Sequence, residues 1–323
     1  MGEEKDRNDQ ILVTVGITTK NRAEEVARCV ASLAMLNVPC EIIVVDDGSE
    51  TPVEPLVRAA AAKLQDSKLT LIRWDKSRNY MAARNEIVRL AKGEIVLNLD
   101  DDAYLLDGAA VTNALSAMAA DGQVGALAFP ECDAAGNRKR KQPGRSESPS
   151  FTTHYYGYAH AVRRDAFLEV GGYREFFGFY HEESDMCKRL LDRGLRCVYW
   201  PTAKVAHVPS IRERSDRSLL RFKHGMRNRC LDAMCNEPVP LVWLTLASHV
   251  LRYAVQERRF RREFGIDLTG GSGWLVRELR RFSPETRKER KPLHWRVFWT
   301  WRWVRRVDCM YVSTVDEPPV ASD

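Results

Sequence analysis

Three consecutive carboxylates, Asp100, Asp101 and Asp102, follow an apolar stretch that ends at Leu99. Closely spaced carboxylates repel one another and stay ionised only where a cation or hydrogen-bond donors offset their charge. Hard divalent ions such as Mg²⁺ and Mn²⁺ prefer such oxygen ligands and often bridge to substrate phosphates. The triplet therefore indicates a divalent-metal site, although a solvated acidic turn that caps a helix would have the same sequence.

Two other acidic groups stand at element ends. The segment Asp46–Ser49 follows an apolar stretch, and a carboxylate there can accept hydrogen bonds from a ribose or a base; an Asx turn is the alternative. Glu182, Glu183 and Asp185 open a predicted helix. A carboxylate that faces an acceptor hydroxyl can act as a general base, but the helix dipole also favours acids at this end.

His207 is the fourth candidate, a few residues after Pro201. A lone histidine usually has a structural role. Together with an aspartate cluster it becomes a plausible metal ligand, since imidazole and carboxylate bind the same first-row ions.

The elements that must position these residues alternate between strand and helix. Runs rich in Ile, Val and Leu predict strands at 11–18, 41–45, 69–74, 94–99, 124–129, 155–162 and 195–200, and the helices predicted between them include one that opens with a capping box at Asn21. This alternation predicts an α/β fold with a mainly parallel sheet flanked by helices. Ligands bind such sheets beyond the carboxyl ends of the strands, where the acidic clusters stand.

The three acidic groups and His207 are each weak signals alone, but their order and spacing along the chain are together specific for one protein family. The chain resembles the inverting family-2 glycosyltransferases, which have the Rossmann-like A-type nucleotide-sugar fold. The stretches that carry the resemblance span about Leu12 to Val208 and read TVGITTKNRAEEVARCVASL, EIIVVDDGS, AARNEIVRLAKGEIVLNLDDD and GGYREFFGFYHEESDMCKRLLDRGLRCVYWP, followed by His207.

The resemblance implies a donor site and a metal site. Asp102 would hold Mn²⁺ or Mg²⁺, with His207 completing the metal site, and Asp100 would hold the ribose. The other residues implied in binding the nucleotide or its diphosphate are Thr18, Asn21, Arg22, Asp47, Arg84 and Asp101.

The resemblance also implies a catalytic base in the acidic element at 182–185. Glu183 stands where the family usually has aspartate, so Glu182 and Asp185 remain candidates beside it, and Glu183 is favoured. A second departure precedes the Arg-Asn pair, where Ser77 and Asn79 replace the usual Asn-x-Gly. Because Asn tolerates left-handed φ better than most residues, we expect the turn to survive.

The function so implied is inverting, metal-dependent transfer of a sugar from a nucleoside-diphosphate sugar (UDP first, dTDP or GDP next) to a hydroxyl of a glycan or lipid-linked saccharide. Two alternatives are a nucleotidyltransferase and a non-catalytic sugar-binding relative. The first generally opens with a Gly-rich loop, which the segment Thr18–Arg22 lacks. The second would be expected to have lost the carboxylates.

Charge divides the 323 residues unevenly. Residues 211–310 hold 23 Lys and Arg against 11 Asp and Glu, whereas residues 1–210 hold 27 against 30. We therefore predict a catalytic domain over 1–210 and a basic helical extension over 211–323 that contacts the acceptor, a membrane surface or a second copy in a homodimer. No nucleic-acid reader motif accompanies the charge, so a nucleic-acid partner is not expected.

The segment 290–310 interleaves tryptophans with arginines, as peripheral membrane segments do. Packing of this helix on the catalytic domain or on a second subunit is the other interpretation. The chain shows no apolar run of about 18 residues and no signal-peptide core, so the predicted location is cytoplasmic, with peripheral contact at the inner face of the membrane.

Overall fold

The computed structural model describes residues 13–36, 38–64, 67–209, 217–264, 271–304 and 309–310. Among them, nine strands form one mixed sheet in the order β12-β8-β10-β6-β9-β4-β1-β2-β3. The strands of this sheet are β1 Val13–Thr19, β2 Cys40–Asp46, β3 Lys68–Arg73, β4 Ile95–Asp100, β6 Val124–Ala128, β8 Ser150–Thr152, β9 Ala159–Arg163, β10 Arg196–Tyr199 and β12 Cys309–Met310.

A smaller three-stranded sheet has the order β5-β11-β7. Its strands are β5 Ala103–Leu105, β7 Glu131–Cys132 and β11 Val205–His207. The helices of the α/β part are α1 Ala23–Ser32, α2 Glu54–Ala61, α3 Tyr80–Leu90, α4 Gly108–Ala120, α5 Arg164–Glu169 and α6 Glu182–Asp192, with 3-10 turns η1 Leu33–Met35 and η2 Glu175–Phe177.

Helices cover both faces of the main sheet. Because neighbouring side chains of one strand point to opposite faces, each central strand contributes to both cores. On β2, Ile42 and Val44 join the core under α1, α2 and α4, whereas Ile43 and Val45 join the core under α3, α5 and α6. Strands buried on two faces are nearly continuous apolar runs, as Ile42 to Val45 of β2 are. At Gly16 of β1, an added Cβ would lie 2.3 Å from Ile87 Cγ2, so α3 packs directly on the strand.

The predicted α/β class and flanking helices are confirmed, but the sheet is mixed rather than mainly parallel. Strands β1 to β4 pair in parallel as expected. Strand β9, however, runs antiparallel between β4 and β6. The capping box at Asn21 is wrong: Arg22 is the N-cap residue of α1 and makes no side-chain cap bond.

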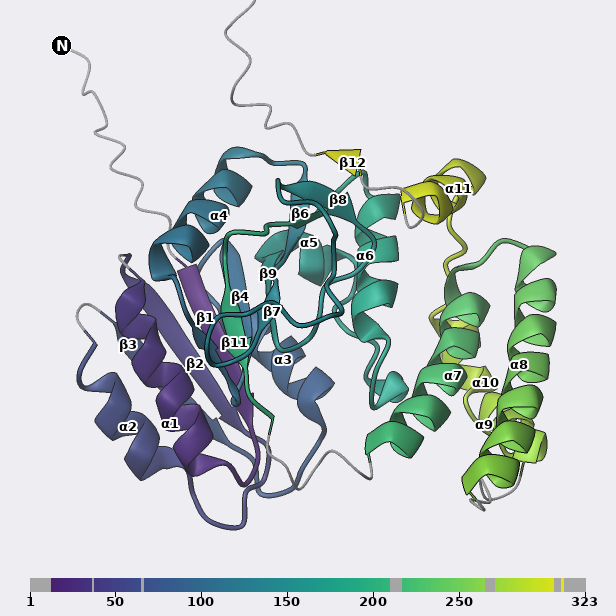
Figure 1. Ribbon diagram of the computed structural model, residues 1–323, viewed down its shortest axis with the longest axis horizontal. Coiled ribbons are helices and arrows are strands. Elements are labelled where there is room, and N and C mark those ends of the chain that lie inside the picture. Colours follow the sequence, from purple (N-terminus) through teal and green to yellow (C-terminus); the bar gives the residue numbers. More distant parts are fainter. Residues whose placement is uncertain are drawn as a thin grey trace, which may run out of the picture.

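Helices follow the sheet towards the C-terminus. They are α7 Arg217–Asn236, α8 Leu241–Phe264, α9 Gly271–Arg281, α10 Ser283–Lys288 and α11 Trp295–Val304. Figure 1 shows them gathered beside α6, on the side of the molecule away from β3. The predicted boundary near Ser210 lies outside the described residues. No helix of the described part of the chain is long and apolar enough to cross a membrane.

Candidate active site

The register of the parallel strands brings the acidic groups at 46–47 and 100–102 to one edge of the sheet. Thr18 of β1 pairs with Val45 of β2 on one side and with Asp100 of β4 on the other. The carboxyl ends of the three strands open into a cleft of about 1530 Å³. Of the twelve residues predicted for the site, ten line this cleft: Thr18, Arg22, Asp47, Arg84, Asp100, Asp101, Asp102, Glu182, Glu183 and His207.

The carboxylates Asp100 and Asp102 meet His207 at the cleft wall. Ligand atoms of these three residues lie within 4.8 Å of one another. β11 delivers His207 because it pairs with Ala103 of β5. Two carboxylates and one imidazole suit Mn²⁺ or Mg²⁺ by ligand chemistry, so the residues fit the predicted metal.

Glu131, at the start of β7, orients the histidine. His207 Nδ1 lies 2.6 Å from Glu131 Oε1, and His207 Nε2 lies 3.3 Å from Asp102 Oδ1. Lys139 Nζ holds the same Glu131 oxygen at 2.8 Å, and the Tyr158 ring stacks on the imidazole. Burial opposes the charged form, but the bonds to Asp102 and Glu131 raise the pKa of His207 to about 9. Glu131 belongs to no motif, so the sequence gives no sign of this role.

Replacing Glu131 with glutamine should lower Mn²⁺ affinity by about 10- to 100-fold, since partners that fix a ligating histidine contribute on that order. Calorimetric titration with Mn²⁺ measures it. The matched control is Glu147→Gln, which changes an exposed acid paired with Arg138 outside the cleft. Equal Mn²⁺ affinity in both variants would contradict the role given to Glu131.

Asp101, the middle carboxylate, turns towards the first loop of the fold. It accepts hydrogen bonds from Thr19 Oγ1 and Arg22 Nη1, both at 2.8 Å. Burial, opposed by Arg22, raises the pKa of Asp101 to about 7. This residue holds the loop after β1 against the end of β4, and Arg22 reaches Asp102 at 3.1 Å as well.

Asp47 and Asn21 each form hydrogen bonds between two loops. Asp47 accepts hydrogen bonds from Ser77 Oγ at 2.6 Å and from the backbone nitrogens of Arg78 and Asn79. Asn79 has a φ of 87° and caps α3, so the turn survives without glycine, as expected. Asn21 lies outside the cleft lining and accepts a hydrogen bond from the backbone of Glu50.

Arg84 connects the two halves of the site. Its guanidinium is 2.6 Å from Asp100 Oδ1 and 3.4 Å from Glu182 Oε1, and it donates to Gly157 O at 2.7 Å. Gly157 N donates in turn to Glu183 Oε1 at 3.1 Å. An added Cβ at Gly157 would lie 3.0 Å from both Arg84 and Glu183, so only glycine fits here without displacing them.

The carboxylates at the start of α6 have different surroundings. Glu182 is buried and accepts a hydrogen bond from Tyr80 at 2.7 Å; its burial and the neighbouring Glu183 raise its pKa well above the usual range. Glu183 is partly exposed to the cleft, and burial raises its pKa too. A carboxylate with a raised pKa that faces a cleft has the properties of a general base.

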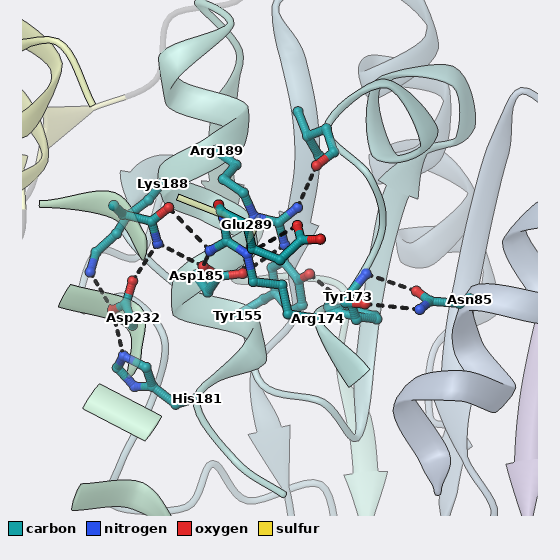
Figure 2. A network of polar contacts seen from close by, with 12 residues as sticks. Asn85, Tyr155, Tyr173, Arg174, His181, Asp185, Lys188, Arg189, Asp232 and Glu289 are labelled. Atoms are coloured by element: carbon teal, nitrogen blue, oxygen red, sulfur yellow. Dashed lines mark hydrogen bonds and ion pairs between the residues drawn. The ribbon is translucent and has the colours of Figure 1, made fainter. Parts of the chain in front are cut away.

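Asp185 lies in a different place. It faces a buried ion cluster in which Arg174, Arg189 and Asn236 bond its oxygens (Figure 2). Although burial opposes the charge, Arg189 and Arg174 hold the pKa of Asp185 below its usual range. Asp185 is outside the cleft lining, so of the three candidates for the base only Glu183 and Glu182 lie at the cleft.

The second wall of the cleft comes from the C-terminal helices. Helix α7 contributes Gly225, Arg229 and Asp232 to this wall. The sequence motifs end near His207 and do not include these residues. The other residues of the wall are Leu241, Leu244, Thr245, Ser248, His249 and Arg252 of α8 and Phe298, Trp299, Trp301 and Arg302 of α11.

Comparisons with known proteins give the family of the chain. The sequence pattern described as glycosyl transferase family 2 matches residues 14–183. The pre-mycofactocin glycosyltransferase of Mycobacterium tuberculosis (strain ATCC 25618 / H37Rv) is 30% identical over 209 residues, which cover 60% of this chain and 42% of that protein. The chain spans less than half the length of the curated relatives it matches.

Two solved structures share the fold. The mannosyltransferase PcManGT of Pyrobaculum calidifontis, in complex with GDP-Man and Mn²⁺, has a TM-score of 0.59 at 20% identity, covering 91% of this chain and 83% of that one. Residues 1–349 of S. aureus TarS, in complex with UDP-GlcNAc, have a TM-score of 0.57 at 16% identity, covering 91% and 90%.

Proposed function

Because the chain belongs to glycosyl transferase family 2, we propose that it transfers a sugar, with inversion, from a nucleoside-diphosphate sugar to an acceptor hydroxyl. One observation carries the proposal. Within a single cleft, Arg84 joins Asp100 of the metal-ligand group to Glu182 beside the base candidate Glu183. One arginine thereby connects the proposed donor site to the acids proposed to remove the acceptor proton.

The donor would lie beyond the ends of β1, β2 and β4, against Thr18 and Arg22, with its diphosphate towards Asp102. Asp102 and His207 would hold Mn²⁺ or Mg²⁺, and Asp100, which the resemblance implies for the ribose, lies close enough to be a third ligand. The metal would supply Lewis-acid stabilisation of charge on the diphosphate leaving group. The positive side chains Arg22 and Arg84 line the same region and favour an anionic ligand there.

Glu183 would take the proton of the acceptor hydroxyl. The acceptor oxygen then forms its bond to the anomeric carbon on the face opposite the diphosphate, and the bond from that carbon to the diphosphate breaks. Positioning supplies much of the rate in such a reaction, because reacting atoms held in line lose no further orientational freedom. The Gly157 N–H and the packed start of α6 orient the Glu183 carboxylate.

A donor screen tests this function. Thermal shift with Mn²⁺ over UDP-, dTDP- and GDP-sugars should single out one nucleotide, with UDP expected first. The selected donor should then release its nucleoside diphosphate slowly, and only when Mn²⁺ is added. Consumption of added pyrophosphate, with formation of a nucleoside triphosphate and a sugar 1-phosphate, would instead indicate a nucleotidyltransferase. Binding without turnover would indicate a non-catalytic sugar-binding protein.

The wall formed by α7, α8 and α11 would receive the acceptor, a glycan or lipid-linked saccharide. Exposed apolar side chains lie at and beside this wall: Trp243 and Leu244 on α8, and Trp295, Trp299 and Trp303 on α11. Trp301, in contrast, is buried and lies over the Lys188 ammonium group at 4.2 Å. An aromatic rim beside a cleft suits a lipid-linked acceptor presented at a membrane surface.

Changing Trp295, Trp299 and Trp303 to serine should reduce recovery on anionic liposomes at least fivefold in a flotation assay, because the exposed rings supply the interfacial contact. The control changes Met35, Leu56 and Leu168, which are exposed to a comparable degree elsewhere. Equal flotation of both variants would remove the membrane role. A change in sedimentation of the tryptophan variant alone would assign the rim to a homodimer contact.

A further inference from the structure

The turn in front of the base candidates has an unfavourable backbone. Tyr180 and His181 have φ values of 70° and 80°, and both are side-chain-bearing residues in the left-handed region. His181 is the N-cap residue of α6, so the next two residues are Glu182 and Glu183. Such a conformation persists only where surrounding contacts determine it. The direction in which the two carboxylates leave the turn depends on those contacts.

Asn228 of α7 supplies one set of contacts. Its side-chain amide nitrogen lies 2.9, 2.7 and 2.7 Å from the carbonyl oxygens of Phe177, Phe179 and Tyr180. The neighbouring Arg227 donates to the Phe177 carbonyl as well, at 2.5 Å. Asn228 is 0% exposed. A buried amide whose two N–H donors are shared among three carbonyls of one turn fixes the path of that turn.

Asp232, one helical turn further along α7, supplies the second set. Its Oδ2 lies 2.7 Å from His181 Nε2 and also accepts a hydrogen bond from Lys188 of α6. Asn236 donates to both Asp232 and Asp185, which links α7 to the first turn of α6. Burial opposes ionisation, but Lys188 and His181 keep the pKa of Asp232 far below its usual range. Asp232 is therefore a fixed negative charge that anchors His181.

From these contacts we infer that Asn228 and Asp232 are positioning residues of the transfer reaction, acting through the turn at residues 177–181 on the base Glu183. The inference rests on the proposed function. It makes α7, which lies beyond the predicted domain boundary, part of the active site. Asn228 is buried and lies outside the cleft lining, so it would act without touching the donor or the acceptor, whereas Asp232, which reaches the cleft wall, would act through His181. Displacing a reacting group by about an ångström can cost on the order of 100-fold in rate.

The experiment uses the full chain and the nucleotide sugar selected by the donor screen, with Mn²⁺. Calorimetry counts donor-binding sites, and the release of nucleoside diphosphate is expressed per donor-binding site, so that unfolded protein does not enter the rate. Asn228→Ala should lower this rate about 10- to 100-fold while the donor Kd stays within threefold. Asp232→Asn, which keeps the side-chain shape, should lower the rate in the same way.

A double variant separates positioning from a general structural effect. In the Glu183→Gln background, Asn228→Ala should lower the rate by less than twofold, because a residue that acts through Glu183 has no effect once the base is absent. The matched control is Cys230→Ala, equally buried on α7 but packed against Tyr253 and Leu275. It should lower the melting temperature and leave the rate per site unchanged.

The outcomes are distinguishable. If the unaltered chain releases no nucleoside diphosphate from any donor, the proposed function itself fails. If the unaltered chain is active and both Asn228→Ala and Asp232→Asn keep its rate per site, or if the effects of Asn228→Ala and Glu183→Gln multiply, the positioning role is overturned.

Discussion

Asp102→Ala is expected to abolish the proposed sugar transfer, with a loss of at least about 1,000-fold, equivalent to about 4 kcal/mol of transition-state stabilisation. The variant removes one of the three side chains that would hold the metal and leaves His207 with Glu131 as its carboxylate partner. Without the metal, charge on the leaving diphosphate is no longer offset. Nucleoside diphosphate release under saturating donor and Mn²⁺ measures the loss.

Asp107→Asn is the control for this variant. Asp107 lies five residues away, outside the cleft, and caps α4, a role that asparagine fills equally well. The control should keep full activity and its Mn²⁺ affinity. Asp102→Ala should lose most of its Mn²⁺ affinity, and a variant that transfers sugar at the original rate would end the metal assignment.

Glu183→Gln has the second largest expected effect, a loss of about 1,000-fold in transfer with donor affinity within threefold. General-base catalysis contributes about 100- to 10,000-fold, and glutamine keeps the size of the side chain but cannot accept the proton. Parallel measurements of donor Kd and of transfer rate separate binding from chemistry. If the rate is unchanged and Glu182→Gln removes it, Glu182 is the base.

The pH profile gives an independent check. Burial raises the pKa of Glu183, so its active, ionised form accumulates only as the pH rises beyond the ordinary carboxyl range. The transfer rate should therefore increase with pH along a limb set by this group, and Glu183→Gln should lack the limb. Glu175→Gln, a change of an acid that lies outside the cleft and bonds Asn85, should retain it.

The parts of the fold that could be predicted from sequence are those with strong local patterns. β1, β2 and β4 are rich in Ile, Val and Leu, and parallel strands bring their carboxyl ends together, so the sequence alone places the acidic motifs on one edge of the sheet. β5, β7 and β11 span three residues or fewer, too short for a periodic signal. They nevertheless deliver His207 and Glu131, which is why the orienting role of Glu131 was missed.

Helix geometry explains why Glu183 and Asp185, both candidates for the catalytic base, lie on different sides of α6. Residues two apart on an α-helix differ by roughly 200° around its axis, so Glu183 and Asp185 cannot face the same cleft. The sequence alone does not say which of the two faces meets the cleft; that depends on Arg174 and on Asn236, far along the chain. The position of Asn21 outside the cleft lining could not be predicted for a similar reason, since its side chain accepts a hydrogen bond from the backbone of Glu50 in another loop.

The contacts of α7 also bear on how hybrid enzymes could be built from relatives. A junction at residue 210 would exchange Asn228 and Asp232 together with the far wall of the cleft, and so would separate the turn before Glu183 from the side chains that hold it. A junction after Asn236 would keep them and exchange only the helices from Leu241 onward, including α8 and α11. Such a hybrid would exchange the proposed acceptor-binding helices and keep the donor site together with the residues that position Glu183.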